Sequence, residues 1–384
     1  MMGAAAARHL ARQADGVAAI GPDEPENRKT HEGVFGSHYD EGRITRTIDP
    51  DADWARLANR SIARYAEIER ESGIGFYMPA GCLVVGPKRG GTDRYIGDVA
   101  EAAARLGVET SLLDDGGLKA RFPFFAFPEG SEGVHEARGA GHISPRRLVK
   151  AQSLLAEKAG ARIIRQTVAS VREENGLAVV RTAEGDTFTA EKALLATGGF
   201  SIAQNLLSAP LQLKVRGRTI AFFEVSEADA AALAAMPSLI VKSPDDVDSI
   251  YMLPPIRYPD GRFYVKIGGD PDDFDLERES DVRAWFRTDG REPVGAHLAR
   301  IVETLLPGLK ALSFSTGSCV TSYTPTSYPM IAYTASPQIA VVTGGNGMAA
   351  KSSDEIGRLG AELLLRGRIK DDAYMTDFLA HFRN

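Results

Sequence analysis

The chain has 384 residues, of which 43% are hydrophobic and 25% are charged, with a formal net charge of -6. This length buries a large core and predicts about two domains. The acidic balance argues against nucleic-acid binding, and no apolar run approaches the roughly 20 residues of a membrane-spanning helix. Two cysteines argue against a disulfide framework or a metal cluster, so we expect a reducing, cytoplasmic setting.

The N-terminal stretch predicts a helix over residues 3–12 and a short strand over residues 17–20. In a dinucleotide-binding unit, a strand and the pattern G-x-G-x-x-G lead into such a helix. Gly3 stands where the third glycine belongs, while the strand and the first two glycines are missing. A plain N-terminal helix explains this stretch taken alone. Together with the matches further along, the pattern predicts that the given sequence begins inside the fingerprint.

A polar, glycine-rich loop follows at residues 31–46. Loops of this length in a compact domain usually have a function, so we expect one here. It contains Gly36, Ser37 and His38 and, after four further residues, the pattern Arg43-x-x-Arg46. Two arginines at this spacing usually mark a solvated helix face. A guanidinium group can also bind a carboxylate through two parallel hydrogen bonds.

The middle of the chain alternates between helices and strands. An amphipathic helix is expected over residues 54–68, stopped at Gly73, and a second helix begins after the cap pair Ser144-Pro145. Expected strands cover residues 82–86, 163–164 and 168–171, with hairpin turns at 175–176 and 184–186. An apolar strand over residues 193–197 ends in Gly198-Gly199.

The next part predicts strands over residues 219–224, 250–254 and 263–268. On the last strand, Phe263, Val265 and Ile267 share one face, and Tyr264 and Lys266 share the other. A lone strand lysine is usually solvated or protects a sheet edge.

Near the C-terminus, Cys319 is followed after four residues by Thr324-Pro325. An expected buried strand over residues 339–342 then runs into Gly344, Gly345 and Gly347, and Lys351 follows. The glycines let backbone amides approach a ligand. Leucines at helical spacing predict that this turn opens a helix, whose positive end would face the ligand.

These motifs, in this order, resemble the amine-oxidising FAD-dependent oxidoreductases of the D-amino-acid oxidase and sarcosine oxidase type. The matching patterns are Gly-Ser-His-x4-Arg-x-x-Arg, Cys-x4-Thr-Pro and the glycine turn ending in lysine. The resemblance implies an α/β plus α+β fold with a Rossmann-like FAD-binding domain and a mostly antiparallel substrate domain. The expected ranges are 1–75, 143–212 and 319–384 for the first domain, and 76–142 and 213–318 for the second.

The resemblance also implies FAD as cofactor, with a covalent link through Cys319. It places Lys266 and Arg43 against the flavin ring, Lys266 assisting oxygen reduction. Arg46 and Lys351 are implied to bind the substrate carboxylate, with Tyr251 and Met252 near the substrate. The implied cofactor-binding residues are Gly3, Ser37, His38, Arg43, Val168, Thr197, Gly198, Cys319, Gly344, Gly345, Asn346, Gly347, Met348 and Lys351.

The expected function is hydride transfer to FAD from a secondary or tertiary amine or N-alkyl amino acid, with oxygen as acceptor and hydrogen peroxide as product. One alternative is a dehydrogenase that passes electrons to a carrier or quinone, and another is an inactive member lacking the first strand. Asp270 and Thr321 depart from the family's histidine and tyrosine. These departures suggest a substrate other than sarcosine.

Overall fold

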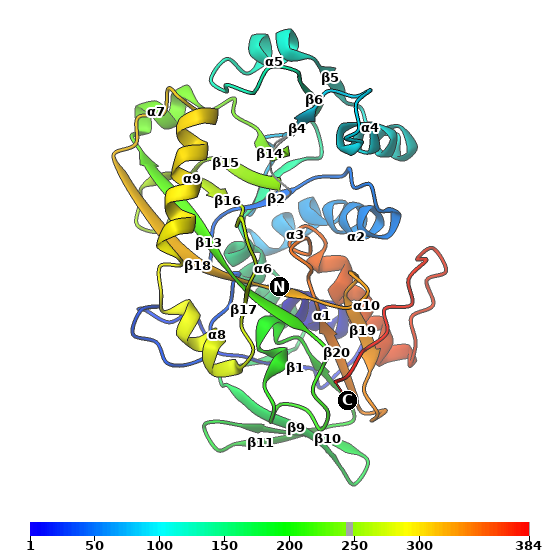
Figure 1. The fold of residues 1–384 in the computed structure, drawn as a ribbon. Helices are drawn as coiled ribbons and strands as arrows, with labels where there is room; N and C mark the ends of the chain where they lie inside the picture. Colours follow the sequence, from blue (N-terminus) through cyan, green and yellow to red (C-terminus); the bar gives the residue numbers. More distant parts are fainter. Residues whose placement is uncertain (243–248, 384) are drawn as a thin grey trace.

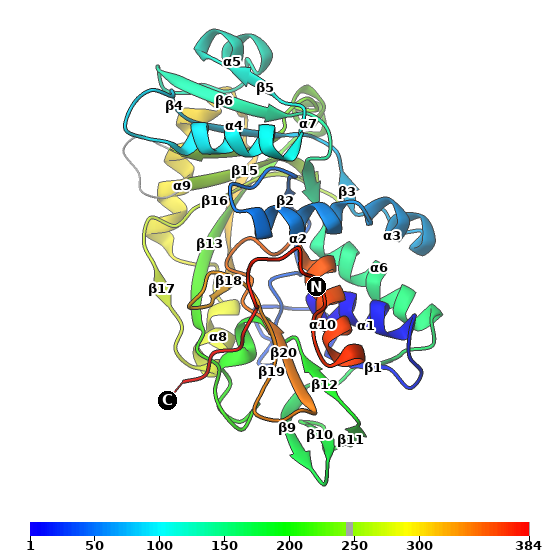
Figure 2. The same cartoon turned by 90° about the vertical axis from the view of Figure 1, so that its right-hand side faces the viewer.

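The structure is a computed structural model that describes residues 1–242 and 249–383 (Figure 1). One end of the elongated molecule is built on a large antiparallel sheet, and the other on small sheets packed against helices (Figures 1 and 2). Within the described residues, no helix is both long and apolar enough to cross a membrane. The expected class, an α/β part with a mostly antiparallel second sheet, is confirmed. The expected domain boundaries stay a prediction.

The large sheet has nine strands in the described residues, ordered β17-β13-β16-β15-β14-β4-β6-β5, with β18 also paired to β13. Neighbouring strands in this sheet run antiparallel, except β14 and β4, which are parallel. Helix α9 covers this sheet with Val294, Leu298 and Val302, an apolar stripe at helical spacing. The strands are β4 Cys82–Pro87, β5 Ser111–Leu113, β6 Ser131–Glu136, β13 Lys214–Val225, β14 Ser238–Lys242, β15 Ser249–Arg257, β16 Phe263–Gly268, β17 Phe274–Asp275 and β18 Ser313–Tyr323.

The other end contains short sheets. Strand β1 pairs in parallel with β8, and β12 pairs in parallel with β20, which also pairs with β19. A hairpin sheet, β11-β10-β9, projects from this end, and a small sheet, β2-β7-β3, lies toward the large one (Figure 1). These strands are β1 Ala18–Ile20, β2 Arg43–Thr45, β3 Tyr77–Met78, β7 Gly141–Ile143, β8 Arg162–Ile164, β9 Val168–Glu174, β10 Leu177–Thr182, β11 Thr187–Ala190, β12 Ala193–Leu195, β19 Met330–Tyr333 and β20 Ile339–Thr343.

Two helix boundaries lie where the capping residues predict them, the start of α6 and the end of α3. Ser144 caps α6 by accepting a hydrogen bond from the Arg147 amide, and Gly73 ends α3 in the left-handed conformation. The helices are α1 Met2–Ala11, α2 Ala52–Ile62, α3 Tyr65–Ser72, α4 Tyr95–Leu106, α5 Asp115–Arg121, α6 Pro145–Lys158, α7 Glu227–Ala232, α8 Glu279–Phe286, α9 Glu292–Leu305 and α10 Ser353–Arg366, with a 3₁₀ turn at Gly198–Ile202.

Two helix predictions need correction. The helix expected over residues 54–68 is two helices, α2 and α3, separated at Ala63 and Arg64. Arg64 at this break binds Asp354 and Glu355 on α10, at 2.5 and 2.6 Å. The glycine turn does not open a helix directly, because α10 begins only at Ser353, after a run of turns.

The first and last helices pack side by side at the centre of the molecule (Figures 1 and 2). A Cβ atom added at Gly357 of α10 would lie 2.5 Å from the Ala5 Cβ and 2.6 Å from the Met2 carbonyl oxygen. Beneath this contact, Arg8 donates to Asp354 Oδ1 at 2.8 Å, and both side chains are fully buried. Burial alone would raise the pKa of Asp354, but His9, Arg64 and Arg8 hold this pKa well below its usual range.

We expect Gly357→Ala to lower the free energy of unfolding by about 1–3 kcal/mol, because the added methyl group forces α1 and α10 apart. Gly97→Ala in α4 is the matched control, since a Cβ there meets no atom within 4 Å. It should leave stability unchanged or raise it by up to about 1 kcal/mol. Urea unfolding followed by circular dichroism measures both. Equal stability of the two variants would contradict this account of the helix contact.

Candidate functional site

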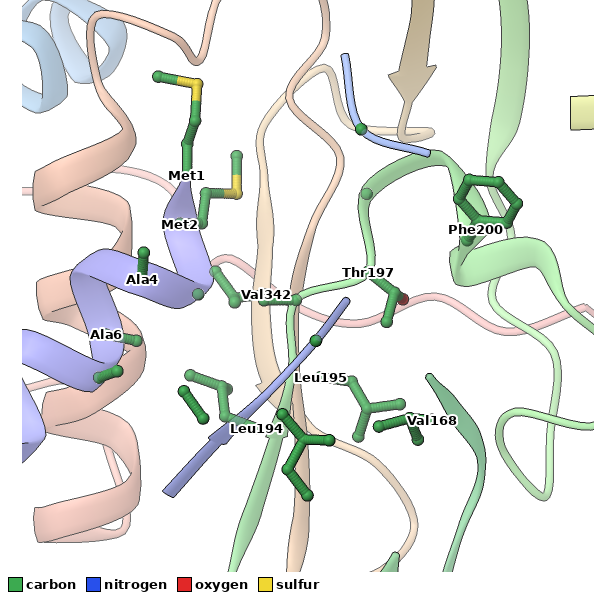
Figure 3. Close-up of a pocket in the computed structure, with 18 of the residues that line it drawn as sticks. Met1, Met2, Ala4, Ala6, Val168, Leu194, Leu195, Thr197, Phe200 and Val342 are labelled. Atoms are coloured by element: carbon green, nitrogen blue, oxygen red, sulfur yellow. The ribbon is translucent and has the colours of Figure 1, made fainter. Parts of the chain in front are cut away.

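A cavity of about 2010 Å³ gathers segments from the whole chain. Figure 3 shows α1 with Met1, Met2, Ala4 and Ala6 on one side, and Thr197, Leu195, Val168 and Phe200 on the other. Eleven of the predicted cofactor-binding residues line it: Gly3, Ser37, His38, Arg43, Val168, Thr197, Gly198, Cys319, Gly344, Gly345 and Gly347. The fold therefore brings most of the predicted cofactor site together in one place.

The cavity is larger than the roughly 300–1,000 Å³ of a typical small-ligand pocket. Part of it lies between β1 and β12, both of which line it. In the part of the chain that the structure describes, β1 pairs only with β8, and β12 pairs only with β20. Each of these strands thus borders the space and has one paired neighbour among the described residues.

The glycine turn fits a ligand that needs close backbone approach. Gly344 and Gly347 have φ angles of 80° and 73°, which favour glycine, and both line the cavity. A Cβ at Gly344 would lie 2.1 Å from Thr324 Cγ2. At the other wall, a Cβ at Gly3 would lie 2.8 Å from that of Ala196, so α1 approaches the end of β12 closely. Glycine backbone at two walls of a large cavity suits a dinucleotide such as FAD.

The loop before β2 is fastened to β18 beside the cavity. Ser37 Oγ donates to the Val320 carbonyl at 2.9 Å and accepts from the Val320 amide at 3.0 Å. Arg43 donates to Cys319 Sγ at 3.5 Å and to the Ser37 carbonyl at 2.8 Å. Burial lowers the pKa of His38 well below its ordinary value, so its imidazole is neutral. Ser37, Arg43 and Cys319 therefore form one connected group.

Asp40 joins the two cations that were predicted to act on the flavin. Lys266 is fully buried, and its Nζ donates to Asp40 Oδ2 at 2.5 Å and to the Gly42 carbonyl at 2.8 Å. Arg43 binds the same carboxylate oxygen, and Tyr258 donates to Oδ1 at 2.8 Å. Burial and then Arg43 push the pKa of Lys266 well below its ordinary value. Asp40 is the carboxylate that opposes this loss of charge.

Asp49 joins the two cations that were predicted to bind a carboxylate. Its Oδ2 lies 3.3 Å from Lys351 Nζ and 3.5 Å from Arg46 Nη1. Asp49 and Lys351 are each 4% exposed. Burial and then Arg46 lower the pKa of Lys351 to about 8, in spite of Asp49. Arg46 and Lys351 thus converge on a carboxylate of the chain itself, and their binding of a substrate carboxylate stays a prediction.

The remaining predicted residues lie in different surroundings. Tyr251 packs over Gly268 on the neighbouring strand, with Lys266 Nζ 5.8 Å from its ring centroid. Met252 is fully buried in the hydrophobic core of the large sheet, so the structure gives it no place beside a substrate. The side chain of Asn346 accepts from the Thr324 amide and donates to the Gly344 carbonyl, which supports the turn. Three residues predicted to bind the cofactor do not line the cavity, namely Asn346, Met348 and Lys351, and neither Arg46 nor Lys266 lines it.

Sequence reasoning missed Asp40 and Asp49. The signal was present as a symmetric spacing, Asp40-x-x-Arg43-x-x-Arg46-x-x-Asp49, in which each arginine pairs with the nearer aspartate. The partner lysines come from β16 and from the turn before α10, far along the chain.

Comparison with known proteins identifies the family of the chain. A model of the FAD dependent oxidoreductase family (DAO) matches residues 1–363. The chain is 26% identical over 376 residues to monomeric sarcosine oxidase from Bacillus sp. strain NS-129, covering 97% of this chain and 92% of the relative. The open form of NikD, described as an unusual amino acid oxidase, superposes with a TM-score of 0.79 at 20% identity, over 100% of this chain and 95% of that chain. L-proline dehydrogenase from P. horikoshii superposes with a TM-score of 0.73 at 17% identity, over 97% of this chain and 92% of that chain.

The ion pair between Asp40 and Lys266 predicts a measurable coupling in stability. Asp40→Asn leaves buried cations without their carboxylate and should lower the free energy of unfolding by about 3–5 kcal/mol. Lys266→Met in the same chain should recover part of that loss, giving a coupling energy of about 1–3 kcal/mol in urea unfolding.

The exposed pair Lys29–Asp289, at 2.7 Å, is the control and should couple by about 1 kcal/mol or less. Strictly additive effects at Asp40 and Lys266 would show that the two side chains do not interact energetically.

Proposed function

Because the chain belongs to the family of FAD-dependent oxidoreductases, we propose that it oxidises a secondary or tertiary amine or N-alkyl amino acid by hydride transfer to FAD. The observation that carries the proposal is the convergence of eleven predicted cofactor residues on one cavity, among them Arg43, which shares Asp40 with the buried Lys266. Similarity to monomeric sarcosine oxidase along nearly the whole chain supports the substrate class.

In this proposal the glycine turn and the N-terminus of α1 hold the phosphate-bearing part of FAD, through backbone amides and the positive end of the helix. Thr197 and Gly198, at the end of β12, and Val168 contact the cofactor through the cavity wall. The bound flavin supplies the hydride acceptor, and the protein supplies position and charge. We assign residues 1–75, 143–212 and 319–384 to this cofactor domain, and residues 76–142 and 213–318 to the substrate domain.

Arg46 and Lys351 orient the substrate through its anionic group, and Tyr251 borders the reacting part of the substrate. Holding the donor C–H in one orientation supplies much of the rate gain, because reaction then needs no further ordering. Fixed positive charge from Lys266 and Arg43 stabilises negative charge that develops during electron transfer to the acceptor. Asp40 binds both cations and offsets part of that positive charge.

The function is tested with the purified, FAD-loaded protein under argon. N-alkyl amino acids and secondary amines should bleach the yellow flavin absorbance, whereas matched tertiary alcohols should not. Admitting air should restore the colour and release hydrogen peroxide if oxygen is the acceptor. If the yellow colour returns only after a quinone is added, the enzyme is a dehydrogenase. Bound flavin that no amine in a broad screen can bleach would overturn the proposed activity.

We further propose that Cys319 carries the flavin through a thioether bond. This C–S bond would replace the thiol S–H bond and one C–H bond of the flavin's 8-methyl group, and the two electrons released would pass to the flavin and then to the enzyme's electron acceptor. Cys319 lines the cavity, and its sulfur accepts from Arg43 at 3.5 Å, so a cation lies beside the nucleophilic sulfur. The second thiol, Cys82, is buried elsewhere, and burial raises its pKa to about 12. We expect acid-denatured protein to retain the yellow colour and to have a mass increased by one FAD.

Cys319→Ser should release the flavin on denaturation, and Cys82→Ser should retain it. Colour that passes through a filter with the wild-type protein would show that the cofactor is held without a covalent bond.

A further inference from the structure

One carboxylate oxygen of this chain already occupies the position between Arg46 and Lys351. Asp49 Oδ2 is shared by Lys351 Nζ at 3.3 Å and Arg46 Nη1 at 3.5 Å. Its other oxygen accepts from the Asp51 amide at 3.3 Å, which fixes the carboxylate in this orientation. One oxygen shared by two cations is how a ligand carboxylate would be held.

The surroundings show which other partners these cations have. Lys351 Nζ makes one other hydrogen bond, to the Met348 carbonyl at 3.4 Å, and lies 5.8 Å from the Trp54 ring centroid. Glu136, the other carboxylate near Arg46, instead accepts from the amide and hydroxyl of Thr47. Within the described residues, Asp49 is therefore the carboxylate in direct contact with both cations.

The charges of this group have a consequence for ligands. Two cations and one carboxylate leave a net charge of +1, and Asp49 already contacts one donor atom of each cation, so an incoming carboxylate must share or displace it. Displacing Asp49 would leave a buried carboxylate without a cation, which is costly. A neutral group in the same position makes no such demand.

We propose that Asp49 is a specificity-determining residue, a built-in carboxylate with which a substrate carboxylate must compete at Arg46 and Lys351. The inference rests on the proposed function for the position of the substrate. The site then gives free N-alkyl amino acids little advantage over amines whose carboxylate is absent or masked, such as amino-acid amides and plain secondary amines.

The test uses two ligands that the enzyme cannot oxidise, propionate and its neutral isostere propionamide. Their dissociation constants are measured with the FAD-loaded protein by calorimetry and by the shift in flavin absorbance. A pH of about 6.5 keeps Lys351, whose pKa is about 8, protonated. The wild-type protein should bind the two ligands with affinities within about threefold of each other, since Asp49 offsets the advantage of the charge.

Asp49→Asn keeps an oxygen acceptor for the Asp51 amide and removes the competing charge. It should tighten propionate binding about tenfold or more and leave propionamide unchanged. Asp51→Asn is the matched control: it removes the same charge two residues away, at the cap of α2, where asparagine also serves as a cap. It should leave both affinities unchanged.

A wild-type protein that already prefers propionate at least tenfold would overturn the inference, and this result does not depend on whether the variant folds. An unchanged ratio in Asp49→Asn, or an equal gain in Asp51→Asn, would also overturn it. These outcomes are independent of the proposed activity, because flavin bleaching by amines is measured separately and neither ligand contains an amine.

Discussion

The pairing of buried cations with two aspartates is the interaction on which the candidate site depends. An ammonium or guanidinium group removed from water is costly unless a carboxylate and further hydrogen bonds compensate it. Asp40 does this for Lys266 and Arg43, and Asp49 does it for Lys351 and Arg46. Both aspartates and both arginines lie in one short segment at and around β2, while each lysine comes from a distant part of the chain. The segment therefore links the large sheet to the turn before α10.

The two groups are built alike. At Asp40, the Tyr258 hydroxyl donates to the carboxylate, and Lys266 donates to this carboxylate and to the Gly42 carbonyl. At Asp49, Lys351 likewise has one carboxylate and one backbone carbonyl, that of Met348, as partners. Burial lowers the pKa of both lysines, to about 8 for Lys351 and well below the ordinary value for Lys266, so each lysine depends on its aspartate to stay charged.

Much of the fold could be predicted from the sequence where the signal is local. The cap at Ser144, the stop at Gly73 and the hairpin turn at Asn175-Gly176 are set by residues within a few positions. The break between α2 and α3 could not be predicted, because Arg64 finds its partner 290 residues away. The position of Met252 could not be predicted for a similar reason. The alternation of residues separates the two faces of its strand, but only the assembled sheet shows that the face with Met252 packs in the core.

The candidate site could likewise be predicted where the signal is local and not where it depends on distant residues. Motifs with fixed spacing predicted which residues line the cavity, since each motif carries its own backbone geometry. The counter-charges Asp40 and Asp49 were not predicted, because their importance depends on lysines that the sequence places elsewhere. The symmetric spacing of aspartates and arginines around β2 is the local pattern in the sequence that corresponds to these pairs.

The packing of α1 against α10 has a consequence for biosynthesis. Arg8 and Asp354 are 346 residues apart, so the first helix leaves the ribosome long before its partner exists. At about 5–20 residues per second, the delay is roughly 17–70 s. During that time the apolar face of α1 and the buried charge of Arg8 have no native neighbour, and the nascent chain is a candidate for chaperone capture. Closure of the two ends is thus a late event in folding, and full assembly of the cavity must follow it.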